Sequence, residues 1–249
     1  MARQRHLPHA PITEALIDIH VSPRDGLTFA GLRDAIDAAE FGYYLKGPIS
    51  QGTFAVRVAS DGQPPQTTAE SAQVGLRFHS ADEKYVAQCR LTGFTLSRLP
   101  PYETWTNPMD EARRVWVIYV EHLAPTRVTM VATRFINNLH LPLETGASYQ
   151  TYLRKLVDVP EEAPQAVEAF LQRFQLVDAT SSARVILTLA LDGMPADGLA
   201  PVILDVDAFT STNLDPTDRE LWTTLERLRE LKNRSFFGTI TERAAELYE

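Results

Sequence analysis

Two aspartates in the segment VILDVDAF have a spacing that could support metal chemistry. If this segment is a β-strand, Asp205 and Asp207 occupy positions i and i+2 and share one face. Two carboxylates on one face can jointly hold Mg²⁺ or Mn²⁺. A half-exposed antiparallel strand gives the same alternation without any metal. We therefore expect no metal or other cofactor, and the alternative is a metal-dependent hydrolase or nuclease that also uses His140 or His20.

Glu14 and Arg134 form a second candidate, because they carry opposite charges at matching places in two similar segments. The segments are TEALIDIHV, residues 13–21, and TRFINNLHL, residues 133–141. If the two segments are neighbouring strands, these side chains can form a charge-assisted pair. We predict that they lie within hydrogen-bond reach of each other. The alternative is that Arg134 binds an anion in a central cleft.

Asn137 is a polar residue on what would be the apolar face of its strand. Simple alternation places it with Phe135 and Leu139, and places Arg134 on the opposite face. A buried amide needs hydrogen-bond partners. We interpret Asn137 as a residue that ties down a neighbouring loop, and the alternative is contact with a ligand.

The loop RLPPYETW combines aromatic residues with an arginine. Exposed aromatic side chains beside an arginine suit the binding of a partner or ligand. We therefore predict a binding role for Tyr102, Trp105 and Arg98. The aromatic residues of the helix that follows, Trp116 and Tyr119, are expected in the core.

Composition excludes several classes of protein. The chain has 249 residues with 24 basic and 32 acidic ones, a formal net charge of −8, which argues against a nucleic-acid partner. Cys89 is the one cysteine, so an intramolecular disulfide and a cysteine-rich zinc site are excluded. No apolar run is long enough for a membrane helix, and residues 1–10 do not resemble a signal peptide, so we expect a cytoplasmic protein. Familiar nucleotide-binding and catalytic motifs are absent, which favours a protein that is not an enzyme.

The elements that would position these residues follow a similar order twice. In the first part we expect a strand over 11–21, a helix over 27–41, strands over 53–59, 74–79 and 85–96, and a helix from Asn107-Pro108 to Ala124-Pro125. In the second part we expect a strand over 128–141, helical segments over 148–156 and 165–174, strands over 184–191 and 202–209, and a helix from Asp215-Pro216.

The two long helices have similar expected starts. Asn107 would cap the first, with proline at its first helical position and Asp110 in its first turn. In the second helix, Asp215 would be the cap and Asp218 would lie in the first turn. The sequence therefore predicts an α+β protein with antiparallel sheets and two similar β-α-β-β-(β)-α halves in tandem. The halves, residues 1–124 and 125–249, would be a pseudo-duplication. They are expected to pack as one globular unit. The alternative is a single helix-grip-like sheet around the C-terminal helix, with a ligand cavity beneath it.

Four segments, PITEALIDIHV, GFTLSRLPPYETW, TRFINNLHLP and FFGTIT, together resemble an uncharacterised, sporadically distributed family of bacterial and archaeal proteins of about this length. Its members share an N-terminal P-[IP]-x-E-[AV] strand and an R-[FY]-x-N strand, which Arg134, Phe135 and Asn137 match here. The resemblance implies no known activity. The patchy distribution of the family suggests carriage on mobile or defence-associated loci.

Together these observations predict a non-enzymatic binding module. It would recognise a protein partner or a small ligand at the junction of the two halves. The residues expected to take part are Glu14, Arg98, Tyr102, Trp105, Arg134 and Asn137.

Overall fold

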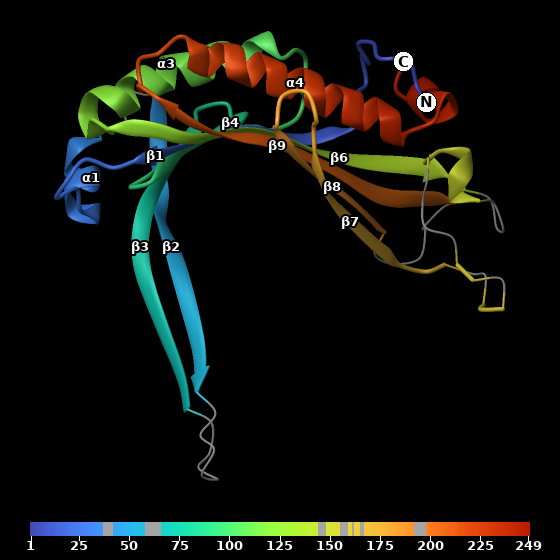
Figure 1. Ribbon diagram of the computed structural model, residues 1–249, viewed down its shortest axis with the longest axis horizontal. Coiled ribbons are helices and arrows are strands. Elements are labelled where there is room, and N and C mark those ends of the chain that lie inside the picture. Colours follow the sequence, from blue (N-terminus) through green and yellow to red (C-terminus); the bar gives the residue numbers. More distant parts are fainter. Residues whose placement is uncertain are drawn as a thin grey trace.

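The computed structural model describes residues 1–36, 42–57, 66–143, 148–154, 159–160, 162–164, 167–191 and 198–249, and for 53–57 and 66–70 it describes the backbone alone. One strongly curved antiparallel sheet forms the body, and the two long helices lie along its convex side (Figure 1). Its strands are β1 (Ile12–Ser22), β2 (Tyr43–Arg57), β3 (Gln66–Ser80), β4 (Tyr85–Arg90), β5 (Gly93–Arg98), β6 (Arg127–Pro142), β7 (Phe170–Val177), β8 (Arg184–Leu191) and β9 (Leu199–Leu214). The helices are α1 (Phe29–Ala35), α3 (Thr106–Leu123), α4 (Glu220–Thr239), α5 (Glu242–Glu246) and the 3₁₀ turn η1 (Tyr149–Thr151).

The strand order is β2-β3-β4-β5-β1-β6-β9-β8-β7. Antiparallel pairing between β1 and β6 at the centre joins the two predicted halves into one sheet. Outward from β1 the order is β5, β4, β3 and β2, and outward from β6 it is β9, β8 and β7. The predicted α+β class with antiparallel pairing is confirmed. The sheet is continuous, and the first strands of the two halves, β1 and β6, lie side by side.

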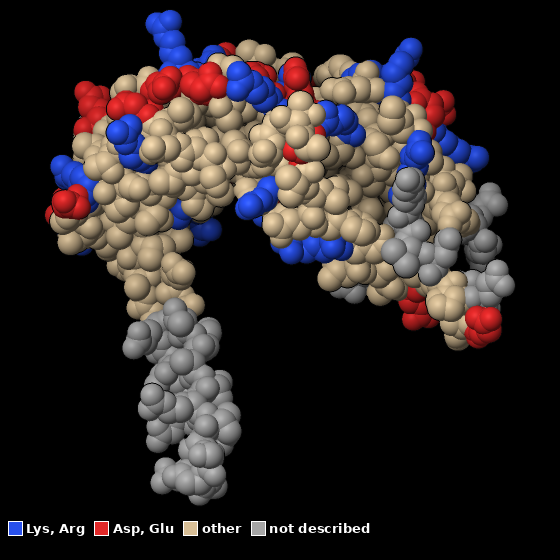
Figure 2. Space-filling model, in the orientation of Figure 1, with Lys and Arg blue, Asp and Glu red and all other residues tan. Residues whose placement is uncertain are grey.

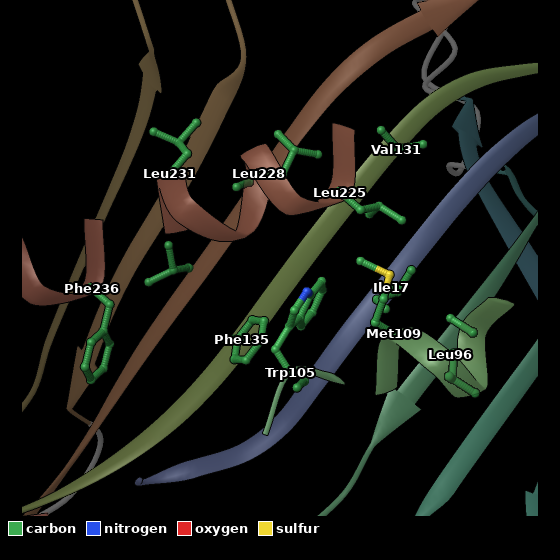
Figure 3. Packing of buried hydrophobic residues seen from close by; sticks show 14 of the residues in the cluster. Ile17, Leu96, Trp105, Met109, Val131, Phe135, Leu225, Leu228, Leu231 and Phe236 are labelled. Atoms are coloured by element: carbon green, nitrogen blue, oxygen red, sulfur yellow. The ribbon is translucent and has the colours of Figure 1, made fainter. Parts of the chain in front are cut away.

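The apolar alternation of the central strands builds the core. In β1 the side chains of Ala15, Ile17 and Ile19 are buried, since alternate residues of a strand share one face. On this face α3 stacks Trp116 and Tyr119 against Phe94, each ring centroid 5.2–6.0 Å from its neighbours. The leucines that α4 buries face the middle strands beside it (Figure 3). Both helices are therefore positioned by the centre of the sheet, and their outer surfaces carry interspersed acidic and basic side chains (Figure 2).

Several predicted boundaries are wrong. The segment 85–96 is two strands, because a turn at 91–92 separates β4 from β5. At Gly93 a Cβ atom would lie 2.7 Å from the carbonyl oxygen of Ile19, so the close pairing of β5 with β1 depends on glycine there. The helix expected over 27–41 is described only as α1, because Ile36 has an extended backbone, and 37–41 lie outside the described residues.

The segment 165–174 was predicted as helical and this is wrong, since β7 begins at Phe170 and pairs with β8 along its whole length. Pairing with a neighbouring strand overrides a local apolar pattern. Residues 165–166 lie outside the described part. Of the helical segment expected over 148–156, the structure has only η1, with 155–158 not described.

The predicted caps are also wrong. Helix α3 begins after Trp105, and Asn107 instead donates a hydrogen bond from Nδ2 to Glu103. Asp110 is therefore outside the first turn of α3. Helix α4 begins after Arg219, so Asp215 and Asp218 both lie before it. Asp215 accepts a hydrogen bond from the backbone N–H of Thr217, and Asp218 accepts one from that of Glu220. Among the described residues no helix is long and apolar enough to cross a membrane.

Candidate functional site

The predicted site residues are divided between the two faces of the sheet. Tyr102, Trp105 and Asn137 line one cavity on the helix-covered face. Arg134, by contrast, alternates with the buried Phe135 and lies on the concave face with Asp205. This division follows the alternation that the sequence predicts for Arg134 and Asn137, and it places Tyr102 and Trp105 on the face of Asn137.

The cavity has a volume of about 520 Å³ and lies where the two predicted halves meet. The first half contributes residues 4–7, residues 10–12 at the start of β1 and residues 102–106, and the second contributes β6 and one side of α4. The residues of α4 are spaced along one side of the helix. They are Glu226, Arg229, Lys232, Asn233, Phe236 and Phe237.

Aromatic rings form one wall of the cavity. The ring of Phe135 contacts Tyr102 edge-on at 5.6 Å and Trp105 at 5.9 Å between centroids, and Figure 3 shows Phe135 and Trp105 next to each other. The indole Nε1 of Trp105 donates a 2.9 Å hydrogen bond to Glu226 on α4. This bond ties the loop of the first half to the helix of the second. Trp105 was expected to be exposed, and it is buried instead.

Lys232 is the unexpected residue of the cavity. Its side chain is buried, and Nζ lies 3.6 Å from the ring centroid of Phe135 and donates a hydrogen bond to Asn233 Oδ1 at 2.5 Å. Burial and the nearby charge of Arg229 lower the pKa of Lys232 to about 7. Within the described parts of the chain, no carboxylate forms an ion pair with this amine. A buried cation without a counter-charge is costly, and such groups cluster at functional sites.

The sequence did contain a signal for Lys232. Its position is four residues after Leu228 and four before Phe236, which places a lysine inside the apolar stripe of the last helix. This lysine was not singled out from the sequence, because a helical stripe alone does not show which of its residues line a cavity.

Asn137 is 2% exposed, as expected for a residue on the apolar face. Its Nδ2 donates hydrogen bonds to the carbonyl oxygens of Phe135 at 3.2 Å and Leu204 at 2.9 Å. The amide therefore holds β6 to β9, and the prediction that it ties down a loop is wrong. Asn137 is also one of the residues that line the cavity.

Arg98 does not line the cavity. Its Nη2 donates a 2.7 Å hydrogen bond to the carbonyl oxygen of Pro101, and its guanidinium lies over the ring of Tyr85 at 4.9 Å. Arg98 therefore supports the turn that leads into Tyr102. Burial raises the pKa of Tyr102 to about 12, so its hydroxyl keeps its proton at neutral pH.

On the concave face, Arg134 binds Asp205 with two N–H groups, at 2.9 Å from Nε and 2.6 Å from Nη2. This pair takes the place of the predicted Glu14–Arg134 hydrogen bond. The two strands are neighbours as expected, but Glu14 lies opposite Ile136. The charge of Glu14 is a minor contribution to the raised pKa of Arg134, behind those of Asp205 and Asp207.

Asp205 and Asp207 share one face of β9, as predicted, with buried apolar residues on the other. The structure does not bring the suggested histidines to them: His20 Nε2 lies 2.8 Å from Asp18 Oδ2, and His140 is exposed further along β6. The described residues contain no group of three or more His, Cys, Asp or Glu side chains that could hold a metal ion. The Arg134 guanidinium instead neutralises Asp205.

Asp207 gives a testable pH effect. Burial raises its pKa to about 6, with a smaller contribution from Asp205, so the folded state retains a proton that the unfolded chain loses near pH 4. The cost of ionising Asp207 therefore appears between pH 4 and 6 and is complete above pH 6. We expect Asp207→Asn to raise the free energy of unfolding at pH 7 by about 1–3 kcal/mol and to have little effect at pH 4. Urea denaturation at both values measures this, with Asp34→Asn on the surface as control; equal effects at the two pH values would contradict it.

No known family model matches the chain, and no curated protein sequence matches it.

Proposed function

We propose that the protein is a non-enzymatic binding module whose ligand is a small organic molecule held in the cavity between α4 and the loop 102–106. The observation that carries this proposal is the buried amine of Lys232, which faces an aromatic-lined cavity without a charged partner among the described residues. Both predicted halves contribute walls, so the ligand would bind at their junction.

The walls favour a particular ligand chemistry. The rings of Phe135 and Trp105 suit a flat, apolar body. Lys232 and Arg229 supply cationic donors at the same cavity, which suits a carboxylate at one end of the molecule. Arg229 is only loosely paired, with Nη1 3.8 Å from Glu226. An aromatic or aliphatic carboxylate is therefore the class of ligand that we propose.

The remaining proposals have less support. A protein partner would find exposed apolar side chains on β7, including Leu171 and Val177. Duplication of the two halves is supported by the matching outward strand order on each side of the β1–β6 pair. A place in a mobile or defence-associated locus rests on the sequence resemblance. A metal-dependent hydrolase would have to displace Arg134 from Asp205 before a cation could bind.

Calorimetric titration with 3-phenylpropionate tests the proposed function. This probe has a flat apolar body and one carboxylate. At pH 6, where the amine of Lys232 is protonated, we expect saturable binding to the wild-type protein and at least tenfold weaker binding to Lys232→Met. The variant keeps the apolar stem and loses the cation. The control is Lys46→Met, which removes an exposed lysine far along the sheet and should leave the affinity unchanged. Equal affinity in wild type and Lys232→Met would contradict the proposal.

A further inference from the structure

The amine of Lys232 is held in surroundings that favour its neutral form. The face of the Phe135 ring beneath Nζ stabilises the charged form. Burial together with the charge of Arg229 disfavours protonation and lowers the pKa of Lys232. Among the described residues, Nζ donates its hydrogen bond to the neutral amide of Asn233. At a slightly alkaline pH this amine therefore presents a lone pair, whereas an ordinary lysine is protonated.

A neutral lysine amine in an apolar pocket is a nucleophile for carbonyl carbon. The cavity gives a small carbonyl compound access to this amine, since Lys232 is one of its lining residues. Arg229 is three residues earlier on α4 and lines the same cavity, where it can hold a carboxylate. The two residues thus match the two functional groups of an oxo acid.

We propose that Lys232 condenses with the carbonyl carbon of an oxo acid bound in this cavity and holds it as an imine. The proposal rests on the proposed function, because it uses the same cavity and the same class of carboxylate ligand. It goes further by giving the ligand a carbonyl group and by making the attachment covalent and reversible.

The step balances as a condensation. The Nζ lone pair forms a bond to the carbonyl carbon, and the carbonyl π electrons move to its oxygen, which takes up a proton. Nitrogen then loses its protons as the hydroxyl leaves as water, and the C=N bond replaces the C=O bond. The two protons that nitrogen loses balance the two that the departing oxygen takes up, so the step needs no other reagent.

Reductive trapping tests this inference. The full chain is incubated at pH 8 with phenylpyruvate and sodium cyanoborohydride, which reduces an imine to a stable secondary amine. Each trapped site gains the mass of one phenylpyruvic acid less one oxygen atom, and peptide mapping locates it. We expect Lys232 to be labelled at least tenfold faster than Lys46, which is exposed. An excess of 3-phenylpropionate should protect Lys232 and leave Lys46 unchanged.

Two variants and one internal reference complete the design. Lys232→Arg keeps a cation and removes the primary amine, so labelling of that peptide should be lost, while Lys46→Arg should not change it. The exposed N-terminal amine of Met1 reports the rate for an unassisted amine. Protection by 3-phenylpropionate is measured on the wild-type protein, so the test stands even if a variant does not fold.

The outcomes separate the two proposals. If 3-phenylpropionate binds but Lys232 is labelled no faster than Lys46 or Met1, the imine is wrong and the proposed function stands. If 3-phenylpropionate does not bind and Lys232 is not labelled, both are wrong. Selective and protectable labelling of Lys232 supports both.

Discussion

Replacing Lys232 with methionine is expected to raise the free energy of unfolding at pH 6 by roughly 3–5 kcal/mol. The pKa of Lys232 falls from its ordinary value of 10.5 to about 7, and each unit corresponds to about 1.4 kcal/mol of preference against the charged form. Methionine has nearly the same length and fits the stripe between Leu228 and Phe236. The variant removes the buried charge and keeps the apolar packing of the side chain.

The sign of this effect depends on pH. Below pH 7 the lysine is protonated in both the folded and the unfolded state, so the cost of burying the cation is fully present. Between pH 7 and 10.5 the unfolded chain binds more protons than the folded one, and wild-type stability therefore rises with pH. The advantage of Lys232→Met should accordingly shrink over this range.

Urea denaturation of both proteins at pH 6 and pH 9 measures the effect. Lys46→Met serves as control, because that lysine is exposed and its replacement should change stability by only a few tenths of a kcal/mol. A variant less stable than wild type at pH 6, or a stability difference that does not change with pH, would contradict this. Either result would show that the folded state already stabilises the charged amine.

Replacing Phe135 with alanine is expected to lower the free energy of unfolding by about 3–5 kcal/mol. Phe135 is 1% exposed, and its ring contacts Tyr102, Trp105 and the amine of Lys232. The substitution removes the ring by which β6 lines the cavity. It also removes the aromatic surface over which the amine lies, so binding of 3-phenylpropionate should be lost with it.

The matched control is Phe174→Ala on β7, which makes the same chemical change at a side chain that is 38% exposed. We expect that variant to lose about 1 kcal/mol or less. Urea denaturation gives both values, and calorimetry gives the change in binding. Similar losses for the two variants would indicate that the wall around Phe135 collapses to fill the space.

Periodicity within a strand was sufficient to predict the centre of the sheet. The buried alternation of β1 and β6 follows from their apolar residues alone, as does the shared face of Asp205 and Asp207. The partner of Arg134 could not be predicted in this way. That contact depends on the register between β6 and β9, which joins residues 71 positions apart and has no local signal.

The candidate site was predicted only in part. Tyr102 and Trp105 do line a cavity, but Trp105 is buried rather than exposed, because the loop folds back against Phe135 and α4. Lys232 and Glu226 belong to the same cavity and were missed, since their role depends on how α4 lies over β6. The placement of a helix over a sheet is a tertiary property that helical periodicity does not specify.

Pairing of β1 with β6 at the middle of the sheet has a consequence for synthesis of the chain. The hydrogen bond between Thr133 and Leu16 joins residues 117 positions apart, so the seam closes only after more than half of the protein has been made. Until β6 leaves the ribosome, β1 has an open edge on that side, which is a template for pairing with other chains. The nascent first half is therefore the species most exposed to aggregation, and a chaperone that covers β1 would act before residue 142 emerges.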